Sequence, residues 1–290
     1  MHRKTPCYDC YRVELCSVID YRMRGIKLNI QIIIVLILNF IISLIGTLAY
    51  SVRLVGVRTG KIAVSFALFN VLMLISRTAV TFQVPILTKF VENSTGNSDL
   101  LKIFNCIIIV SGVAAVVGTF LIPTFQRLLY KGVLAFAVNR SIPKLLIHSF
   151  SKTGIRHMRD CVSVPVKENI TNINYKKLPI KIIVFNLLTV ALITVGALAP
   201  IYAGSVEPDL RATCITLSSV INGIATIIMA VFIDPSLSIM TDDVIEGKTS
   251  EDDFRACVIG MVGSKMVGTF AAIFLLIPAT YAIVFIARIL

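Results

Sequence analysis

Four cations stand near the start of the second long apolar run of this sequence and inside it. Arg53, Arg58 and Lys61 lie in a short stretch between two apolar runs, and Arg77 lies deep within the second run. A helix from Ile62 to Leu87 would be about 39 Å long, with Arg77 within about 4 Å of its middle. An arginine at that depth costs at least about 2.5 kcal/mol to insert into a membrane, so it needs a partner or a water-filled cavity. Arg77 is therefore the leading functional candidate.

These cations suit a ligand that carries phosphate oxygens. Arginine binds such oxygens through two parallel hydrogen bonds, and a cationic mouth that leads inward to another cation favours an anionic head group. The mouth cations are explained about as well by the rule that places positive charge in cytoplasmic loops. Several polar residues continue the line, although packing between helices is their usual role: Asn70, Ser76, Thr78, Thr81 and Gln83.

Two more charged residues lie in or near apolar runs. Asp234 precedes Pro235 in the fifth run, and Lys265 stands at the start of the sixth. Asp234 is the candidate counter-charge of the site. The alternatives are a purely structural pair between Asp234 and Arg77 or Lys265, or a Lys265 side chain that extends to the membrane surface. We favour the structural explanation for Lys265 and assign it no function.

Patterns for enzyme chemistry, cofactors and metals are missing from the sequence. The stretch Gly56–Lys61 has one residue too few between its glycines for a P-loop and no Ser or Thr after the lysine. The three histidines lie outside the apolar runs, and the seven cysteines include one isolated CxxC at Cys7 and Cys10, which predicts neither a disulfide framework nor a zinc site. We expect a protein that is not an enzyme and binds no cofactor or metal.

The composition identifies the elements that must position these residues. The 290-residue chain is 56% hydrophobic and 15% charged, against about 25% charged in soluble domains. Each of six apolar runs is long enough to cross a bilayer, and helices satisfy the backbone there. We predict an all-α polytopic membrane protein with six transmembrane helices, at about 30–50, 62–87, 103–123, 182–203, 212–233 and 266–286.

The distribution of charge predicts the orientation. The net charge is +12, and residues 124–181 hold eleven Lys or Arg against two acids. We attribute this excess to the positive-inside rule rather than to nucleic-acid binding. The loops after the first, third and fifth runs are then cytoplasmic and both termini are outside. Because six bases in the tail 1–29 oppose this orientation, we expect residues 1–22 to lie upstream of a natural start at Met23.

A basic linker, residues 124–179, separates two three-span segments, 30–123 and 180–290. Its beginning predicts an amphipathic cationic helix at the membrane surface, where anionic lipids would hold it. The acidic segment 241–253 is expected to be simply solvated. The apolar face of the predicted helix comprises Phe125, Leu128, Leu129, Val133, Phe136 and Ala137.

The two three-span segments match each other at a shift of 150 residues. The matches include Lys27 with Lys177, Gly46 with Gly196, Pro85 with Pro235, and Gly118 with Gly268. Three spans per repeat is an odd number, so the second repeat must be inverted, as in many transporters whose sites lie at midplane between the repeats. Pro85 and Pro235 would break their helices at equivalent positions next to such a site.

Several motifs of this chain resemble the Amj family. They are YSVRL at 50–54 with GVRT at 56–59, SRTA at 76–79, LRAT at 210–213, SSVING at 218–223, and the Asp234-Pro235 pair. The similarity covers roughly residues 30–290. The positions that it carries over are Arg53, Arg58, Arg77, Arg211 and Asp234, and Arg211 joins the candidate anion-binding residues on this ground.

The resemblance implies a bacterial lipid II flippase of the cytoplasmic membrane, the alternate to the MurJ type. Such a protein moves the undecaprenyl-pyrophosphate-linked peptidoglycan precursor to the outer leaflet for cell wall synthesis. Its partners would be lipid II and membrane lipids, with no nucleic acid. Six spans make a small cavity for so large a head group, so a homodimer or a groove open to lipid is expected. The alternative functions are a small solute or ion transporter and a membrane scaffold protein.

Overall fold

The computed structural model describes residues 30–94, 97–139, 161–163 and 178–290. Within these residues all regular structure is helical, and six helices are long and apolar enough to cross a membrane. The predicted class and the predicted number of spans are therefore confirmed. The predictions for residues 1–22 and for most of the basic linker lie outside the described residues.

The first half of the chain contributes three long helices. α2 (Ile30–Leu48) continues through η1 (Ala49–Ser51) into α3 (Val52–Thr59). Gly60 ends α3 with a left-handed backbone, φ 63°, which glycine adopts without steric cost. α4 (Ile62–Glu92) then returns along α2, and α5 (Asn97–Asn139) follows it.

The second half repeats this order with more interruptions. It begins with α9 (Ile180–Val206), η3 (Pro208–Leu210) and α10 (Arg211–Thr216). α11 (Ser218–Ile228) passes through the π-helical turn η4 (Met229–Ile233) into α12 (Asp234–Ile245), and α13 (Glu251–Ile289) closes the chain. The Ser250 side chain accepts a hydrogen bond from the Asp253 backbone N–H, and three acids fill the first turn, which together stabilise the start of α13.

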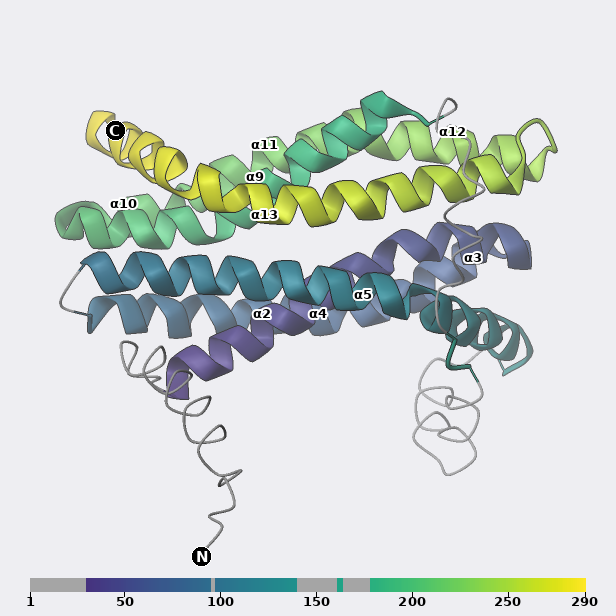
Figure 1. Ribbon diagram of the computed structural model, residues 1–290, viewed down its shortest axis with the longest axis horizontal. Coiled ribbons are helices and arrows are strands. Elements are labelled where there is room, and N and C mark those ends of the chain that lie inside the picture. The colour runs from purple at the N-terminus through teal and green to yellow at the C-terminus, as the bar shows by residue number, and fades with distance from the viewer. Residues whose placement is uncertain (1–29, 95–96, 140–160, 164–177) are drawn as a thin grey trace, which may run out of the picture.

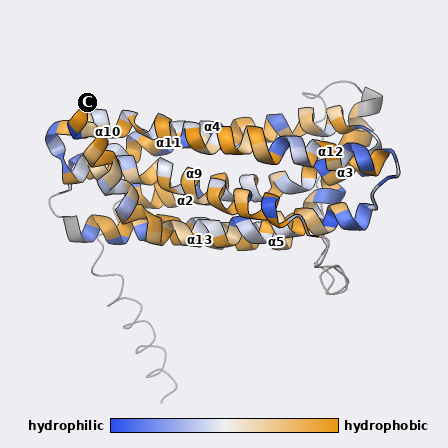
Figure 2. Ribbon diagram, turned by 90° about the horizontal axis from the view of Figure 1, so that it is seen from above, coloured by the Kyte–Doolittle hydropathy of each residue, from blue (hydrophilic) through white to orange (hydrophobic). Residues whose placement is uncertain are grey.

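The two halves form two layers (Figure 1). α2 to α5 make one layer and α9 to α13 the other. In each layer the first helix is central, because α2 packs against α4 and α5 while α9 packs against α11 and α13. Figure 2 shows α4 and α11 along one side of the bundle and α5 and α13 along the other. The closest packing between the halves is that of α5 against α13.

The main core lies between the halves. Phe104, Ile107 and Ile108 of α5 are fully buried there, as are Ala199 of α9 and Leu276 of α13. The spans that contain α4 and α11–α12 are the least buried of the six. One side of the bundle is thus tightly packed, and the other exposes most of its helical surface.

Two local predictions need correction. α4 continues through Pro85 to Glu92 as one α-helix, so the expected break at Pro85 is wrong. At the matching position the helix is interrupted, because the π turn η4 ends immediately before Asp234 and Pro235 occupies the first turn of α12. A proline needs no hydrogen-bond donor in a first turn.

The predicted surface helix is also placed differently. The segment from Phe125 onward is helical, but it continues α5 rather than forming a separate helix, and its contact with the membrane surface stays a prediction. Leu129 and Val133 on its apolar face are buried against Val52 and Val55 of α3. Protein contacts therefore hold this part of the face, whereas Leu128 is exposed.

Candidate functional site

Arg77 is the central residue of α4, with 15 residues on either side in a helix of 31. Its side chain is exposed, and within the described part of the chain it forms no ion pair. The arginine is therefore not neutralised by Asp234 or by another described acid. An exposed, uncompensated arginine at this depth is available to an anion.

Arg77 belongs to a polar face of α4. Asn70, Arg77 and Thr81 are all exposed, and their spacings of seven and four residues put them on one side of the helix. Phe66 precedes Asn70 by one turn on the same side. We call Asn70, Arg77 and Thr81 the α4 polar face.

The second half carries a comparable face on α11 and α12. Ser219, Thr226, Asp234 and Ser238 are exposed, at spacings of seven, eight and four residues. The spacing of eight contains the π turn η4, whose wider turn accommodates the additional residue. We call these four residues the α11–α12 polar face. It belongs to the opposite layer but lies on the same side of the bundle as α4 (Figures 1 and 2).

Arg53 lies between α4 and the α11–α12 polar face. Its guanidinium donates to Asp234 Oδ1 at 3.1 Å and to Ser238 Oγ at 3.2 Å, both on the α11–α12 polar face. The same guanidinium lies over the Phe66 ring of α4, 5.2 Å from its centroid. Arg53 thus joins the halves, and Asp234 pairs with Arg53 rather than with Arg77 or Lys265.

Arg58 and Lys61 lie at the same end of the bundle. Arg58 Nε contacts Glu251 Oε1 at 2.6 Å, which ties α3 to the first turn of α13. Lys61 is half-buried and directly precedes α4, where its backbone N–H donates to the Gly56 carbonyl. The structure therefore brings three predicted cations to one end, and the acidic segment expected to be merely solvated supplies one of their partners.

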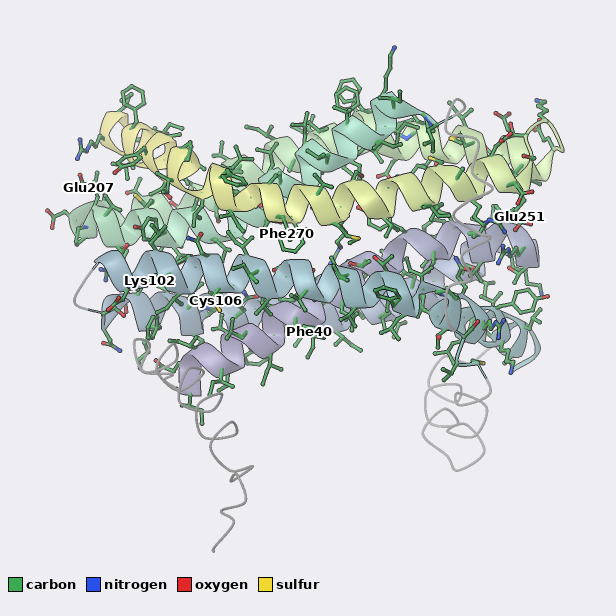
Figure 3. The ribbon with its side chains drawn as sticks, viewed as in Figure 1. Phe40, Lys102, Cys106, Glu207, Glu251 and Phe270 are labelled. Carbon is green, nitrogen blue, oxygen red and sulfur yellow. The ribbon has the colours of Figure 1, made fainter. Side chains whose placement is uncertain are left out.

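Arg211 lies at the opposite end. Its Nη1 is 3.8 Å from Glu92 Oε1 at the end of α4, and its Nε donates to the Gly204 carbonyl at 2.9 Å. Glu92 is 30 residues, or about 45 Å, from the start of α4. Arg288 and Glu207 form a further ion pair at this end, and Figure 3 shows Glu207 and Glu251 at opposite ends of the bundle. The predicted cations thus form an end group, a middle residue and a far-end residue.

Lys265 is the residue that the sequence interpretation misplaced. It is only 9% exposed, so the alternative in which its side chain extends to the membrane surface is wrong, and Asp234 pairs with Arg53 instead of with Lys265. Its ammonium donates to the Ser43 carbonyl at 3.4 Å and lies 5.7 Å from the centroid of the Tyr50 ring. The apolar run begins at Met266, but the helix begins at Glu251, which puts Lys265 14 residues inside it. The depth of Lys265 follows from the bounds of α13 and not from the start of the apolar run.

Buried polar residues extend from Lys265 into both halves. Asn39 of α2 donates to Ser111 Oγ at 2.5 Å and accepts from Gln83 at 3.2 Å, while Ser43 Oγ donates to the Ser111 carbonyl. On the other side, Tyr50 donates to Asn186, which donates to Ser264 Oγ at 2.7 Å. Both asparagines, Asn39 and Asn186, are buried.

This arrangement suits the binding and passage of an anion rather than bond-making chemistry. Arg53, Arg58 and Lys61 lie at one end of the bundle, and Arg77 lies at the middle of α4. Among the described residues no group of three or more His, Cys, Asp or Glu could hold a metal ion. The expected absence of cofactors stays a prediction.

Comparisons with known proteins find a matching family and a relative. The family model described as "Amj: Alternate to MurJ" matches residues 38–287. A relative from Bacillus subtilis (strain 168), named "Lipid II flippase Amj", is 30% identical over 261 residues, which cover 89% of this chain and 97% of the relative. No solved structure matches the chain significantly.

Proposed function

Because the chain belongs to the Amj family, we propose that it is a lipid II flippase of the bacterial cytoplasmic membrane. Its substrate is the undecaprenyl-pyrophosphate-linked precursor of peptidoglycan, which it moves to the outer leaflet for cell wall synthesis. The observation that carries this proposal beyond the family is Arg77, an exposed and uncompensated cation at the middle of a spanning helix. A neutral cargo would leave this charge unexplained.

The cations define a route for the pyrophosphate. Arg53, Arg58 and Lys61 capture it at the cytoplasmic end, where arginines bind phosphate oxygens in a bidentate manner. Asp234 neutralises Arg53 while the site is empty, and the arriving anion competes with it. Arg77 then holds the pyrophosphate at mid-depth. Arg211, at the far end beside Glu92, receives it on the outer side.

The route runs along the side of the bundle that is open to lipid. The α4 polar face and the α11–α12 polar face lie on the least buried spans, so the head group travels between them while the polyprenyl chain stays among membrane lipids. This arrangement relieves the problem of enclosing a large head group within six helices. A homodimer that covers this side of the bundle would be a second way to enclose the head group.

We also propose that the halves are inverted repeats that move against each other. In each half the first helix packs against the other two. An asparagine of that helix bonds to a serine on the third helix in both halves, Asn39 with Ser111 and Asn186 with Ser264. The matched Gly118 and Gly268 both approach the first helix of their own half. These parallels support a common plan with a site between the repeats.

The alternative functions receive less support. A scaffold role requires a sealed interior in which Asp234 neutralises Arg77, whereas Asp234 contacts Arg53 and Arg77 is exposed. A small solute transporter requires an enclosed site, whereas Arg77 lies on an exposed helix face. A translocase of this kind makes and breaks no covalent bonds, so no enzymatic activity is proposed.

Complementation tests the function directly. Bacterial cells depleted of their own lipid II flippases should grow again when they express this chain, and labelled lipid II should become accessible on the outer leaflet. An Arg77→Ala protein that inserts at the same level should rescue neither growth nor accessibility. Failure of the unaltered chain would contradict the function, and rescue by Arg77→Ala would contradict only the role of Arg77.

A further inference from the structure

Lys265 is buried without an acidic partner in the described part of the chain. Among the described residues its ammonium donates one hydrogen bond, to the Ser43 carbonyl, and lies near the Tyr50 ring. Gly46 makes room for it, since a Cβ at position 46 would lie 2.7 Å from Nζ. Within the described residues no carboxylate pairs with Lys265. A lysine kept only for packing would normally be matched by an acid when it is this deeply buried.

The compensated and uncompensated cations differ in their depth. Arg53, Arg58 and Arg211, at the two ends of the bundle, each have a carboxylate partner. In the middle, the described part of the chain gives neither Arg77 nor Lys265 an acidic partner. The centre of the bundle therefore holds two basic side chains without a counter-charge among the described residues, and an anion that arrives there favours the charged form of Lys265.

Hydrogen bonds place these two charges at a similar depth. Gln83 of α4 contacts Asn39 of α2, which fixes the register of the two helices. Toward the cytoplasmic end from this contact, Ser43 follows Asn39 by about 6 Å and Arg77 precedes Gln83 by about 9 Å. Because Ser43 contacts Lys265, Lys265 and Arg77 lie at nearly the same level, with α2 between them.

We propose that Lys265 is the second charge of a mid-depth cationic centre, a positioning residue that lowers the electrostatic barrier for the lipid-linked pyrophosphate while Arg77 contacts it. This inference rests on the proposed flippase function. Lys265 acts through its field and does not touch the head group. The cost of moving an anion is greatest at the middle of the membrane, so an uncancelled positive charge there accelerates crossing more than it strengthens capture.

The size of the effect follows from simple electrostatics. Packed helices lie about 8–10 Å apart, so a head group on the far side of α2 is roughly 15 Å from Lys265. At an effective dielectric constant of about 20, a doubly charged anion at that distance gains enough to speed crossing by a factor of about ten or more. The half-saturating lipid concentration is set at the cytoplasmic mouth and should change by less than about twofold.

The experiment uses the full chain reconstituted in vesicles with labelled lipid II, and measures the crossing rate at several lipid concentrations. Lys265→Gln keeps a donor for the Ser43 carbonyl but removes the charge, whereas Lys265→Arg keeps the charge. Lys89→Gln is the matched control, because Lys89 is an exposed lysine in the last turn of α4. We expect Lys265→Gln to lower the maximal rate at least about tenfold, Lys265→Arg to retain most of it, and Lys89→Gln to resemble the unaltered protein.

A second measurement covers the case in which Lys265→Gln does not fold. Undecaprenyl pyrophosphate should raise the melting temperature of the unaltered protein and of Lys265→Arg to a similar extent. An unaltered maximal rate in Lys265→Gln would overturn the inference, and so would a folded Lys265→Arg that is as slow as Lys265→Gln or is not stabilised by the lipid. If the unaltered protein moves no lipid, the flippase function itself fails, and the two failures are thereby distinguished.

Discussion

At the scale of single residues, charge at mid-depth distinguishes this bundle from a passive helical scaffold. Arginine stays charged in all protein environments and presents a planar fork to phosphate oxygens, which suits Arg77 for contact with a pyrophosphate. Lysine is a point charge on a flexible stem, which suits a residue that acts at a distance from within the interface. The proposed mid-depth centre therefore assigns contact with the pyrophosphate to Arg77 and the electrostatic field to Lys265.

Replacing Arg77 by lysine separates charge from geometry. Arg77→Lys keeps the positive charge but loses the bidentate contact, so we expect lipid II crossing to fall about tenfold, while Arg77→Gln falls further. Because Arg77 is exposed and unpaired in the described structure, neither change should lower the melting temperature by more than a few degrees. Vesicle transport and thermal unfolding of the same preparations measure both effects. Equal rates for the lysine and glutamine variants would show that charge at this position is irrelevant.

At the scale of elements, the sequence predicts the helices better than their ends and contacts. The six apolar runs are found because hydropathy reports residence in lipid directly. Lys265 and the start of α13 are missed because hydropathy says nothing about a helix that continues into polar sequence. The pairing of Arg53 with Asp234 is likewise invisible, because it joins positions 181 apart in the chain.

The misreading of Pro85 has a related physical cause. A proline removes one hydrogen bond from a helix, but neighbouring helices can restore the loss within a membrane bundle. α4 therefore continues through Pro85, whereas the helix that contains Pro235 widens into the π turn η4 just before Asp234. Matched prolines in the two halves therefore do not predict the same local structure.

Close packing of α5 on α13 makes a glycine indispensable between the halves. A Cβ at Gly112 would lie 2.3 Å from Cζ of the Phe270 ring, which Figure 3 shows between the two helices. Because the ring is rigid, we expect Gly112→Ala to lower the free energy of unfolding by about 1–3 kcal/mol. Gly263→Ala in α13 is the control, because its Cβ meets nothing within 4 Å and alanine favours helix. Thermal unfolding in detergent compares the two, and equal melting temperatures would contradict the packing argument.

At the scale of the whole molecule, the ion pairs between the halves are found at the two ends of the described bundle. Arg53–Asp234 and Arg58–Glu251 tie one end, and Arg211–Glu92 ties the other. If these ion pairs break and re-form in turn, the two layers can open first at one end of the bundle and then at the other. Each pair breaks readily, because it is partly exposed and individually contributes at most about 1 kcal/mol. A pyrophosphate that competes for Arg53 would loosen the end that carries Arg53 first.

Charge exchange between Arg53 and Asp234 tests whether that pair only ties the halves or also receives the substrate. Arg53→Asp and Asp234→Arg should each lower the melting temperature, because each places like charges together across the interface. The double variant restores an opposite pair and should recover much of the lost stability. Transport should stay low in the double variant, because the cation then stands on α12 and no longer lies over Phe66 beside the α4 polar face. Recovery of both the melting temperature and lipid II crossing would mean that Arg53 only joins the two halves and that capture of the pyrophosphate depends on Arg58 and Lys61.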